Sequence, residues 1–181
     1  MLLLGCKPPG RHTEQHDVLF AIGNKPADLV EQINNFWPEA ADKLHIDAWR
    51  EVTTVNGYKI TVVEKAIPGT VSGNANKLFF INLGGYTKDQ FAEQHYILLS
   101  VKPDSGAAIQ DAKQSLFYQH NGFEDAPSHI DDKYGIDVDD LYDVEDILLP
   151  AQKEKYRLQI TAAPDLPEDE LHLGYFKLSK L

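Results

Sequence analysis

The chain repeats part of itself, and this internal repeat constrains its fold more than any other feature. Leu4-Gly5 and Glu14-Gln15-His16 recur as Leu83-Gly84 and Glu93-Gln94-His95, 79 residues later and without a gap. The apolar residues after each triplet keep the same register. A repeated segment of this length indicates one structural unit used twice, so we expect two similar units in the chain.

The repeat continues with insertions in the second copy. His45-Ile46-Asp47 recurs as His129-Ile130-Asp131 at an offset of 84 residues. Gly57-Tyr58-Lys59-Ile60 resembles Lys155-Tyr156-Arg157-Leu158 at an offset of 98. The second copy is therefore expected to carry about five extra residues before His129 and about fourteen more around residues 137–150.

Each copy has the pattern of a β-β-α-β-β unit. Short apolar or β-rich runs at residues 2–4 and 16–22 predict two strands, and Pro26 and Pro38 bound a predicted helix. Asn56-Gly57 is a strong hairpin signal, because both residues tolerate positive φ. The second copy is expected to have strands at 78–83 and 95–101 and a helix that starts at a Ser105 cap and closes at Asn121-Gly122.

The predicted fold class is α+β. We expect a tandem duplication of the β-β-α-β-β unit with an approximate two-fold relation, its helices on one side of antiparallel or mixed sheets. The predicted organisation is a first repeat at residues 1–66, a linker at 67–76, a second repeat with an acidic insertion at 77–163, and a C-terminal extension at 164–181. Residues 171–178 of this extension predict a further strand that pairs at a sheet edge.

Charge limits the partners that the protein can have. With 28 acidic and 17 basic residues among 181, the net charge is -11, which disfavours nucleic acid and anionic membrane surfaces. Ten acidic residues and one basic residue fall in residues 124–146. This segment is either a solvated face or a docking surface for a cationic protein partner.

The single cysteine suggests a reducing cytoplasm, because it excludes an internal disulfide framework. Leu4-Gly5-Cys6 superficially resembles a lipoprotein cleavage site, but the apolar run before it is shorter than a secretory signal needs. The chain also has no apolar run long enough for a membrane span. We therefore expect a cytoplasmic protein.

The repeated motifs supply the candidate site residues. In a strand, residues two apart point to one face, so each Glu-x-His and His-x-Asp pair presents two polar side chains together. Such a set binds a divalent metal ion or a polar ligand, performs acid–base chemistry, or forms a structural hydrogen-bond network. The eight candidates are Glu14, His16, His45, Asp47, Glu93, His95, His129 and Asp131.

Two other motifs are weaker candidates for chemistry. Cys6 is disfavoured as a nucleophile, because its counterpart in the second copy is Gly85. The aspartates from Asp137 onward fail the pattern of a helix-loop-helix calcium site, which requires a ligand and then glycine where Leu141 and Tyr142 stand.

Three stretches are similar to a bacterial family known as domain of unknown function 1543. They are Leu78-Phe79-Phe80-Ile81-Asn82-Leu83-Gly84-Gly85-Tyr86, the pair Glu14 and His16, and His45-Ile46-Asp47-Ala48-Trp49-Arg50-Glu51-Val52 with Gly57-Tyr58. The resemblance covers nearly the whole chain. It implies one or two copies of the unit and assigns no activity.

The function expected from the sequence is a cytoplasmic binding or interaction module, with a ligand or partner near the paired motifs. The alternative is a small metal-assisted or acid–base enzyme that uses the same residues. The sequence identifies no cofactor, no particular metal and no oligomeric state, and it does not decide between an enzyme and a binding module.

Overall fold

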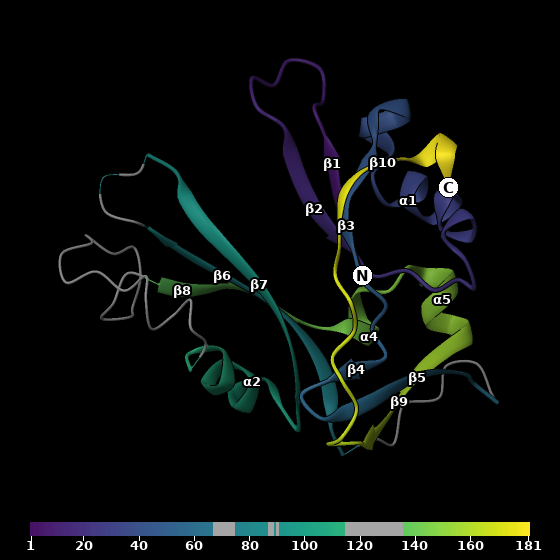
Figure 1. Ribbon diagram of the computed structural model, residues 1–181, viewed down its shortest axis with the longest axis vertical. Coiled ribbons are helices and arrows are strands. Elements are labelled where there is room, and N and C mark those ends of the chain that lie inside the picture. Colours follow the sequence, from purple (N-terminus) through teal and green to yellow (C-terminus); the bar gives the residue numbers. More distant parts are fainter. Residues whose placement is uncertain (67–74, 87–88, 90, 115–135) are drawn as a thin grey trace. The chain divides into compact units, whose positions relative to one another are not determined.

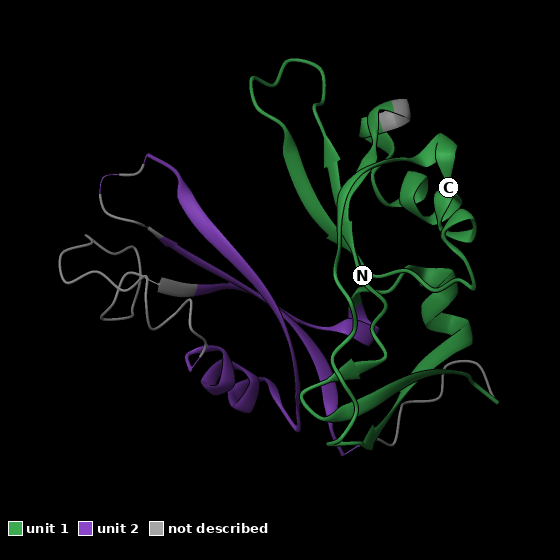
Figure 2. Ribbon diagram, viewed as in Figure 1, with its two compact units in different colours: residues 1–72, 147–181 green, residues 73–146 purple. Residues whose placement is uncertain are grey.

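The computed structural model describes residues 1–66, 75–86, 89, 91–114 and 136–181, and it shows an α+β chain with antiparallel sheets and few helices (Figure 1). The chain forms two compact units (Figure 2). Unit 1 comprises Met1–Ser72 and Ile147–Leu181, and unit 2 comprises Gly73–Asp146. Residues 147–163, which the sequence assigns to the second repeat, thus lie in the first compact unit.

Unit 1 contains a four-stranded sheet in the order β10-β3-β1-β2. Its strands are β1 (Leu2–Cys6), β2 (Gln15–Leu19), β3 (His45–Trp49) and β10 (His172–Lys177), and every neighbouring pair is antiparallel. The strand expected near the C-terminus is β10, which pairs with β3 at the sheet edge and is followed by η3 (Leu178–Lys180). The first strand of the sequence therefore lies at the centre of this sheet.

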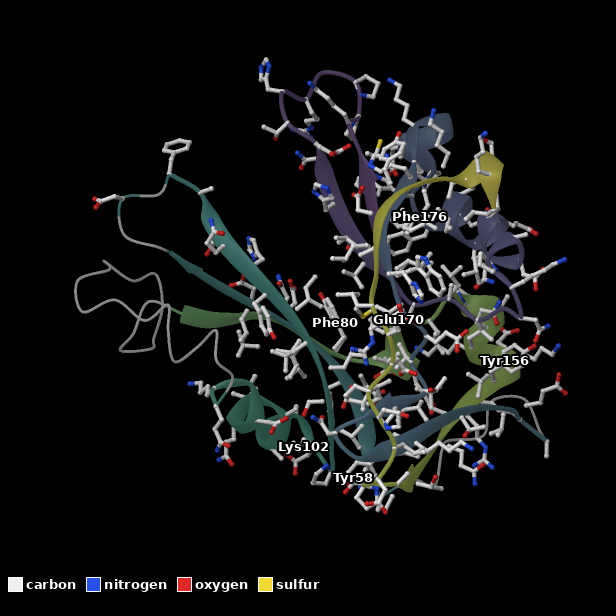
Figure 3. The ribbon with its side chains drawn as sticks, in the orientation of Figure 1. Tyr58, Phe80, Lys102, Tyr156, Glu170 and Phe176 are labelled. Carbon is white, nitrogen blue, oxygen red and sulfur yellow. The ribbon has the colours of Figure 1, made fainter. Side chains whose placement is uncertain are left out.

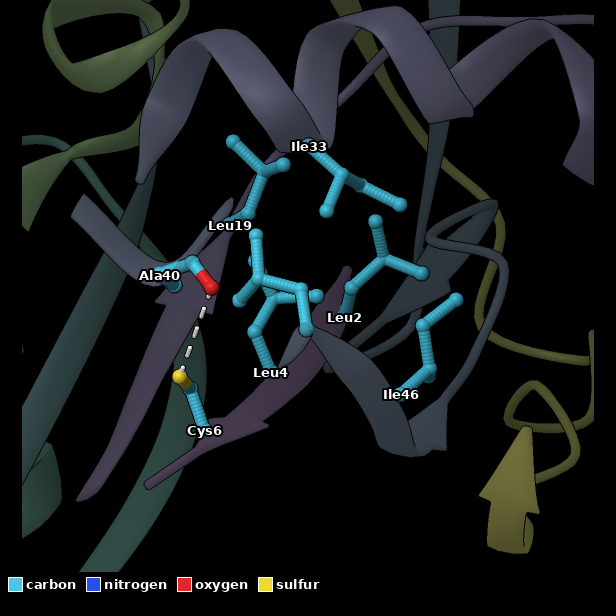
Figure 4. Packing of buried hydrophobic residues seen from close by; sticks show 8 residues of the cluster. Leu2, Leu4, Cys6, Leu19, Ile33, Ala40 and Ile46 are labelled. Atoms are coloured by element: carbon cyan, nitrogen blue, oxygen red, sulfur yellow. Dashed lines mark hydrogen bonds between the residues drawn. The ribbon is translucent and has the colours of Figure 1, made fainter. Parts of the chain in front are cut away.

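A helical layer covers one face of this sheet. It consists of η1 (Pro26–Leu29), α1 (Val30–Phe36) and η2 (Pro38–Lys43). Pro26 and Pro38 each occupy a first helical position, where the missing N–H has no partner to lose. The core beneath α1 includes Leu2, Leu4, Leu19, Ile33 and Ile46 (Figure 4).

A second sheet of unit 1 has the order β4-β5-β9. It contains β4 (Thr54–Val55), β5 (Tyr58–Glu64) and β9 (Tyr156–Ala162), and α5 (Pro150–Lys155) leads into β9. The predicted hairpin is present: Asn56 and Gly57 have φ of 51° and 75°. β5 and β9 pair along their whole lengths, from Tyr58 opposite Ala162 to Glu64 opposite Tyr156.

Unit 2 is built on one three-stranded sheet in the order β7-β6-β8. Its elements are β6 (Lys77–Tyr86), β7 (Glu93–Lys102), α2 (Ser105–Ala112) and β8 (Ile136–Asp143). The N-cap of α2 is Asp104, whose side chain accepts a hydrogen bond from the Ala107 amide, one residue before the predicted cap. Apolar residues of β6 pack against α2 at Phe79, Ile81, Leu83, Ala108 and Ala112.

The predicted strand-for-strand equivalence of the two halves does not extend past the third strand. In unit 1, β3 leads into the β4–β5 hairpin, whereas β8 leads into α4 (Val144–Ile147) and α5 before β9. The predicted insertion at 137–150 is also wrong in part, because residues up to Asp143 form β8 and pair with β6. Val138 and Leu141 both pack on the core, and the extra residue of the bulge between them keeps these two positions, three apart, on one face.

Some sequence predictions lie outside the described residues. These are Asn121-Gly122, the second His-x-Asp motif, most of the linker, and residues 124–135 of the acidic segment. The helix expected to close at Asn121-Gly122 ends earlier, because α2 stops at Ala112. Among the described residues, no helix is both long enough and apolar enough to cross a membrane.

The segment before β10 is fastened to the β4–β5 hairpin by one carboxylate. Asp169 Oδ2 accepts hydrogen bonds from the amides of Thr53 and Thr54 at 2.7 and 2.9 Å, and its Oδ1 accepts one from Thr53 Oγ1 at 2.5 Å. Burial raises the pKa of Asp169, but these hydrogen bonds and the Arg50 charge outweigh it, so its pKa is lowered overall. Phe176 of β10 (Figure 3) then packs against the core of the first sheet.

We expect Asp169→Asn to lower the free energy of unfolding by about 1–2 kcal/mol at neutral pH, because the amide cannot accept all three hydrogen bonds. The native pKa lies below the unfolded value, so this stabilisation is present above the ordinary aspartate pKa of about 3.9 and is lost as the pH falls through the native pKa. Urea titrations at several pH values measure it. Asp165→Asn, in the same segment and exposed, is the control; equal losses in both variants would contradict the assignment.

Candidate functional site

A glycine at the centre of the first sheet creates the space for the candidate site. Gly5 of β1 is paired with His16 of β2 on one side and with His45 of β3 on the other. Leu4 and Cys6 point to the helical face, so the hydrogen that replaces a side chain at Gly5 lies on the opposite face. A Cβ at Gly5 would overlap the side chains of Asp47 and His45. Those two side chains therefore occupy the room that a residue other than glycine would fill.

A β-bulge turns Asp47 over this glycine. Leu3 pairs with Ala48 and Leu4 pairs with Ile46, which leaves Asp47 as the extra residue of β3. An extra residue bends the strand and re-aims its side chain, a device found next to functional sites. The bulge therefore places a carboxylate on the same face as the two histidines.

Four side chains meet over Gly5, and we call them the Gly5 cluster: Glu14, His16, His45 and Asp47. His45 Nε2 lies 3.2 Å from Glu14 Oε1 and 3.2 Å from Asp47 Oδ1. His16 Nε2 lies 3.2 Å from Asp47 Oδ2 and 3.8 Å from Glu14 Oε2. The structure thus brings together all four of the first-copy candidates that the sequence proposed.

The cluster is fixed at one end and accessible at the other. The His45 side chain is 6% exposed, its Nδ1 lies 3.4 Å from the Lys43 carbonyl oxygen, and its ring packs on Tyr175 of β10 at a centroid distance of 4.3 Å. Glu14 and His16 have side chains that are 44% and 45% exposed. A small ligand could therefore reach Glu14 and His16 without any movement of the core.

One carboxylate oxygen in the cluster is not satisfied. Asp47 Oδ2 is buried and has no hydrogen-bond partner among the described residues, although the nearby His16 nitrogen makes an ion-pair contact with it. Buried polar atoms are nearly always hydrogen-bonded, and each exception calls for an explanation, such as a bound water, an ion or a catalytic role. This atom distinguishes the cluster from a fully satisfied structural network.

Cys6 is placed on the other face of β1, away from the cluster. It is fully buried in the core beneath the helices, with its sulfur 4.0 Å from the Ala40 carbonyl oxygen (Figure 4). Burial raises the pKa of this thiol, so the reactive thiolate is disfavoured at neutral pH. The geometry agrees with the sequence argument against a nucleophilic role.

Unit 2 repeats the same construction. Gly84 of β6 is paired with His95 of β7, and a bulge between Asn82 and Leu83 leaves Asp139 of β8 as the extra residue. His95 Nδ1 lies 3.2 Å from Asp139 Oδ2, and its Nε2 lies 3.9 Å from Glu93 Oε2. A Cβ at Gly84 would overlap the Asp139 carboxylate. We call Glu93, His95 and Asp139 the Gly84 cluster.

The strand register shows which residues of β8 occupy the positions of His45 and Asp47. Asp137 is opposite Gly84, where His45 is opposite Gly5, and Asp139 occupies the bulge position of Asp47. The predicted counterparts, His129 and Asp131, lie outside the described residues, so their role stays a prediction. The missed residue is Asp139. A comparison of residue identities misses Asp139, because Asp137-Val138-Asp139 shares with His45-Ile46-Asp47 only the spacing and the final aspartate.

Part of the acidic segment is therefore a paired strand and a short helix. Residues from Ile136 to Asp143 form β8, and Asp143 makes an ion pair of 2.8 Å with Lys77, whose pKa it raises. α4 follows this strand. The docking of a cationic protein partner on residues 124–146 stays a prediction.

Comparison with known proteins assigns part of this chain to a family. Residues 11–62 match the family model described as Domain of Unknown Function (DUF1543). The resemblance predicted from the sequence is thus confirmed over a range that contains all four members of the Gly5 cluster and lacks Gly5. The family description assigns no reaction to them.

A solved structure shows a similar fold. The crystal structure of a protein Il1583 from Idiomarina loihiensis has a TM-score of 0.59 and 17% sequence identity, with 98% of this chain and 94% of that chain covered. At this identity the likeness concerns the fold alone. The comparison with curated proteins gave no match.

The side chains of each cluster contact one another directly and do not surround an open point. Within residues 1–66, 75–86, 89, 91–114 and 136–181, no three or more His, Cys, Asp or Glu side chains are arranged around a point that would hold a metal ion. The chemistry available to the Gly5 cluster is therefore proton exchange, hydrogen bonding or the binding of a cation after rearrangement of its exposed members.

We expect His45→Ala to lower the free energy of unfolding by about 1–3 kcal/mol. The change removes the buried imidazole that Glu14 and Asp47 both contact, so these two carboxylates lose their shared partner. Denaturant titration measures the loss. His12→Ala, an exposed histidine outside the cluster, serves as the control and should change stability by less than about 0.5 kcal/mol. An unchanged stability in His45→Ala would show that this buried histidine has no structural role.

We expect Gly5→Ala to move the side chains of Asp47 and His45 apart, although the variant keeps every hydrogen-bond donor and acceptor of the cluster. The added methyl group displaces the ends of the Asp47 and His45 side chains, and overpacking of this kind typically costs about 1–3 kcal/mol. NMR chemical shifts of the His16 and His45 rings, compared between this variant and Gly84→Ala, are the measurement. Shifts of both rings in Gly84→Ala and not in Gly5→Ala would contradict the geometry.

Proposed function

We propose that the protein is a binding module whose ligand site is the Gly5 cluster. The observation that carries this proposal is the buried, unsatisfied Oδ2 of Asp47, held over Gly5 by a bulge. A purely structural network would be expected to satisfy its buried acceptors. The half-exposed Glu14 and His16 supply an accessible side through which a ligand could enter.

The construction itself supports a functional role. Both units have a central glycine, a histidine from the neighbouring strand paired with it, and an aspartate in a bulge on the other side. A glycine inside a strand and a bulge both weaken a sheet locally. Retaining both devices at the same place in two units is more simply explained by a site than by folding.

We also propose that the two halves of the chain arose by duplication of one β-β-α-β unit with a terminal strand. The shared glycine, histidine and bulge registers support this. So does the pairing of β5 with β9, in which the first residue of each seven-residue strand is opposite the last residue of the other. An antiparallel pair of equivalent strands is compatible with a two-fold relation between them.

The test compares the stabilities of variants at the accessible side of the cluster. We expect Glu14→Gln and His16→Ala to leave the free energy of unfolding unchanged within about 0.5 kcal/mol, or to raise it, because binding sites commonly trade stability for function. Urea denaturation of both variants and of Asp17→Asn, an exposed carboxylate on the same strand, provides the comparison. Losses above about 1 kcal/mol in both cluster variants, with none in the control, would identify the cluster as a structural network.

A further inference from the structure

The His45 ring contacts a backbone carbonyl oxygen through Nδ1. Its Nδ1 lies 3.4 Å from the Lys43 carbonyl oxygen, a partner that can only accept a hydrogen bond, so Nδ1 carries the proton in this contact. In a neutral imidazole the Nε2 atom then has a lone pair. A backbone carbonyl that fixes the tautomer in this way is the usual outer partner of a histidine ligand to a metal.

Two carboxylate oxygens face His45 Nε2. Glu14 Oε1 and Asp47 Oδ1 both lie 3.2 Å from this nitrogen, and ionised carboxylates are acceptors only. A nitrogen lone pair facing two carboxylate oxygens is unfavourable unless a proton or a metal ion lies among them. Asp47 Oδ2, which has no hydrogen-bond partner among the described residues, faces His16 Nε2 in the same manner.

From this arrangement we propose that the Gly5 cluster binds one divalent transition-metal ion of the zinc class, with His16 Nε2, His45 Nε2 and the carboxylates of Glu14 and Asp47 as its ligands. This inference rests on the proposed function and names its ligand. Two ligand atoms that each lie about 2.1 Å from one ion are roughly 3.0–3.4 Å apart, but no three of the described side chains yet surround a common point. The three shortest contacts in the cluster are each 3.2 Å.

The ion enters from the accessible side of the cluster. His45 and Asp47 are held by burial and by the bulge, whereas Glu14 and His16 are about half exposed. The four side chains at present contact one another. Rotation of Glu14 and His16 away from their partners opens a space above Gly5 for the ion. The ion then replaces the protons that the side chains share. Gly5 is required, since a side chain there would fill this point.

The choice of ligands selects the class of metal. Two imidazole nitrogens with carboxylate oxygens suit zinc and its neighbours in the first transition row, whereas calcium and magnesium prefer oxygen ligands alone. The Gly84 cluster offers one histidine, His95, with Glu93 and Asp139. Its single imidazole predicts weaker binding of zinc, so the first site should fill before the second.

The experiment is calorimetric titration of the tag-free 181-residue protein with Zn²⁺ after treatment with a chelator. We expect one tight site per chain, an increase of the melting temperature on binding, and no competition from Ca²⁺ or Mg²⁺ at a hundredfold excess. His16→Ala and Asp47→Asn should each weaken binding at least about 100-fold, since loss of an outer partner alone costs 10–100-fold. Gly5→Ala should weaken it comparably although it removes no ligand.

His12→Ala and Gly84→Ala are the matched controls and should retain the tight site. Absence of tight Zn²⁺ binding by the wild-type protein would overturn the proposal, as would tight binding that survives in both His16→Ala and Gly5→Ala or that is lost in His12→Ala. If zinc fails while Glu14→Gln and His16→Ala leave stability unchanged, the metal is wrong and the binding module stands. If those two variants are also destabilised, both proposals are wrong.

Discussion

The site depends on the absence of one side chain. Gly5 lies in the central strand of its sheet, and a Cβ there would overlap both Asp47 and His45. Only glycine leaves a sheet face open enough for polar side chains from both neighbouring strands to meet above it. The pairing of Gly5 with His16 and His45 brings the two imidazoles to that opening, and the bulge at Asp47 adds the carboxylate.

The opposite face of the same strand explains why this opening is stable. Leu4 and Cys6 alternate with Gly5 and are fully buried beneath the helical layer. Apolar burial of this kind is the main favourable term in folding, so the sheet does not rely on its polar face for stability. A conformationally permissive glycine and an irregular strand pairing can then be accommodated on the polar side.

The two clusters share a construction and differ in composition. The first has two histidines, and Tyr175 of β10 covers the buried one. The second has His95 with carboxylates, and Asp137 is opposite its central glycine where the first unit has His45. If the halves arose by duplication, as we propose, the strand geometry was retained while the ligand chemistry diverged.

By itself the sequence determined the family similarity of residues 11–62, the α+β class, the hairpin at Asn56-Gly57 and the four members of the Gly5 cluster, because short motifs and local periodicity carry that information. Tertiary structure decided the remainder. The place of Asp139 depends on a one-residue bulge, which shifts register without any distinctive residue type. The pairing of β9 with β5 and of β10 with β3 joins segments about a hundred residues apart, and such pairings follow from complementary edges that no local pattern records.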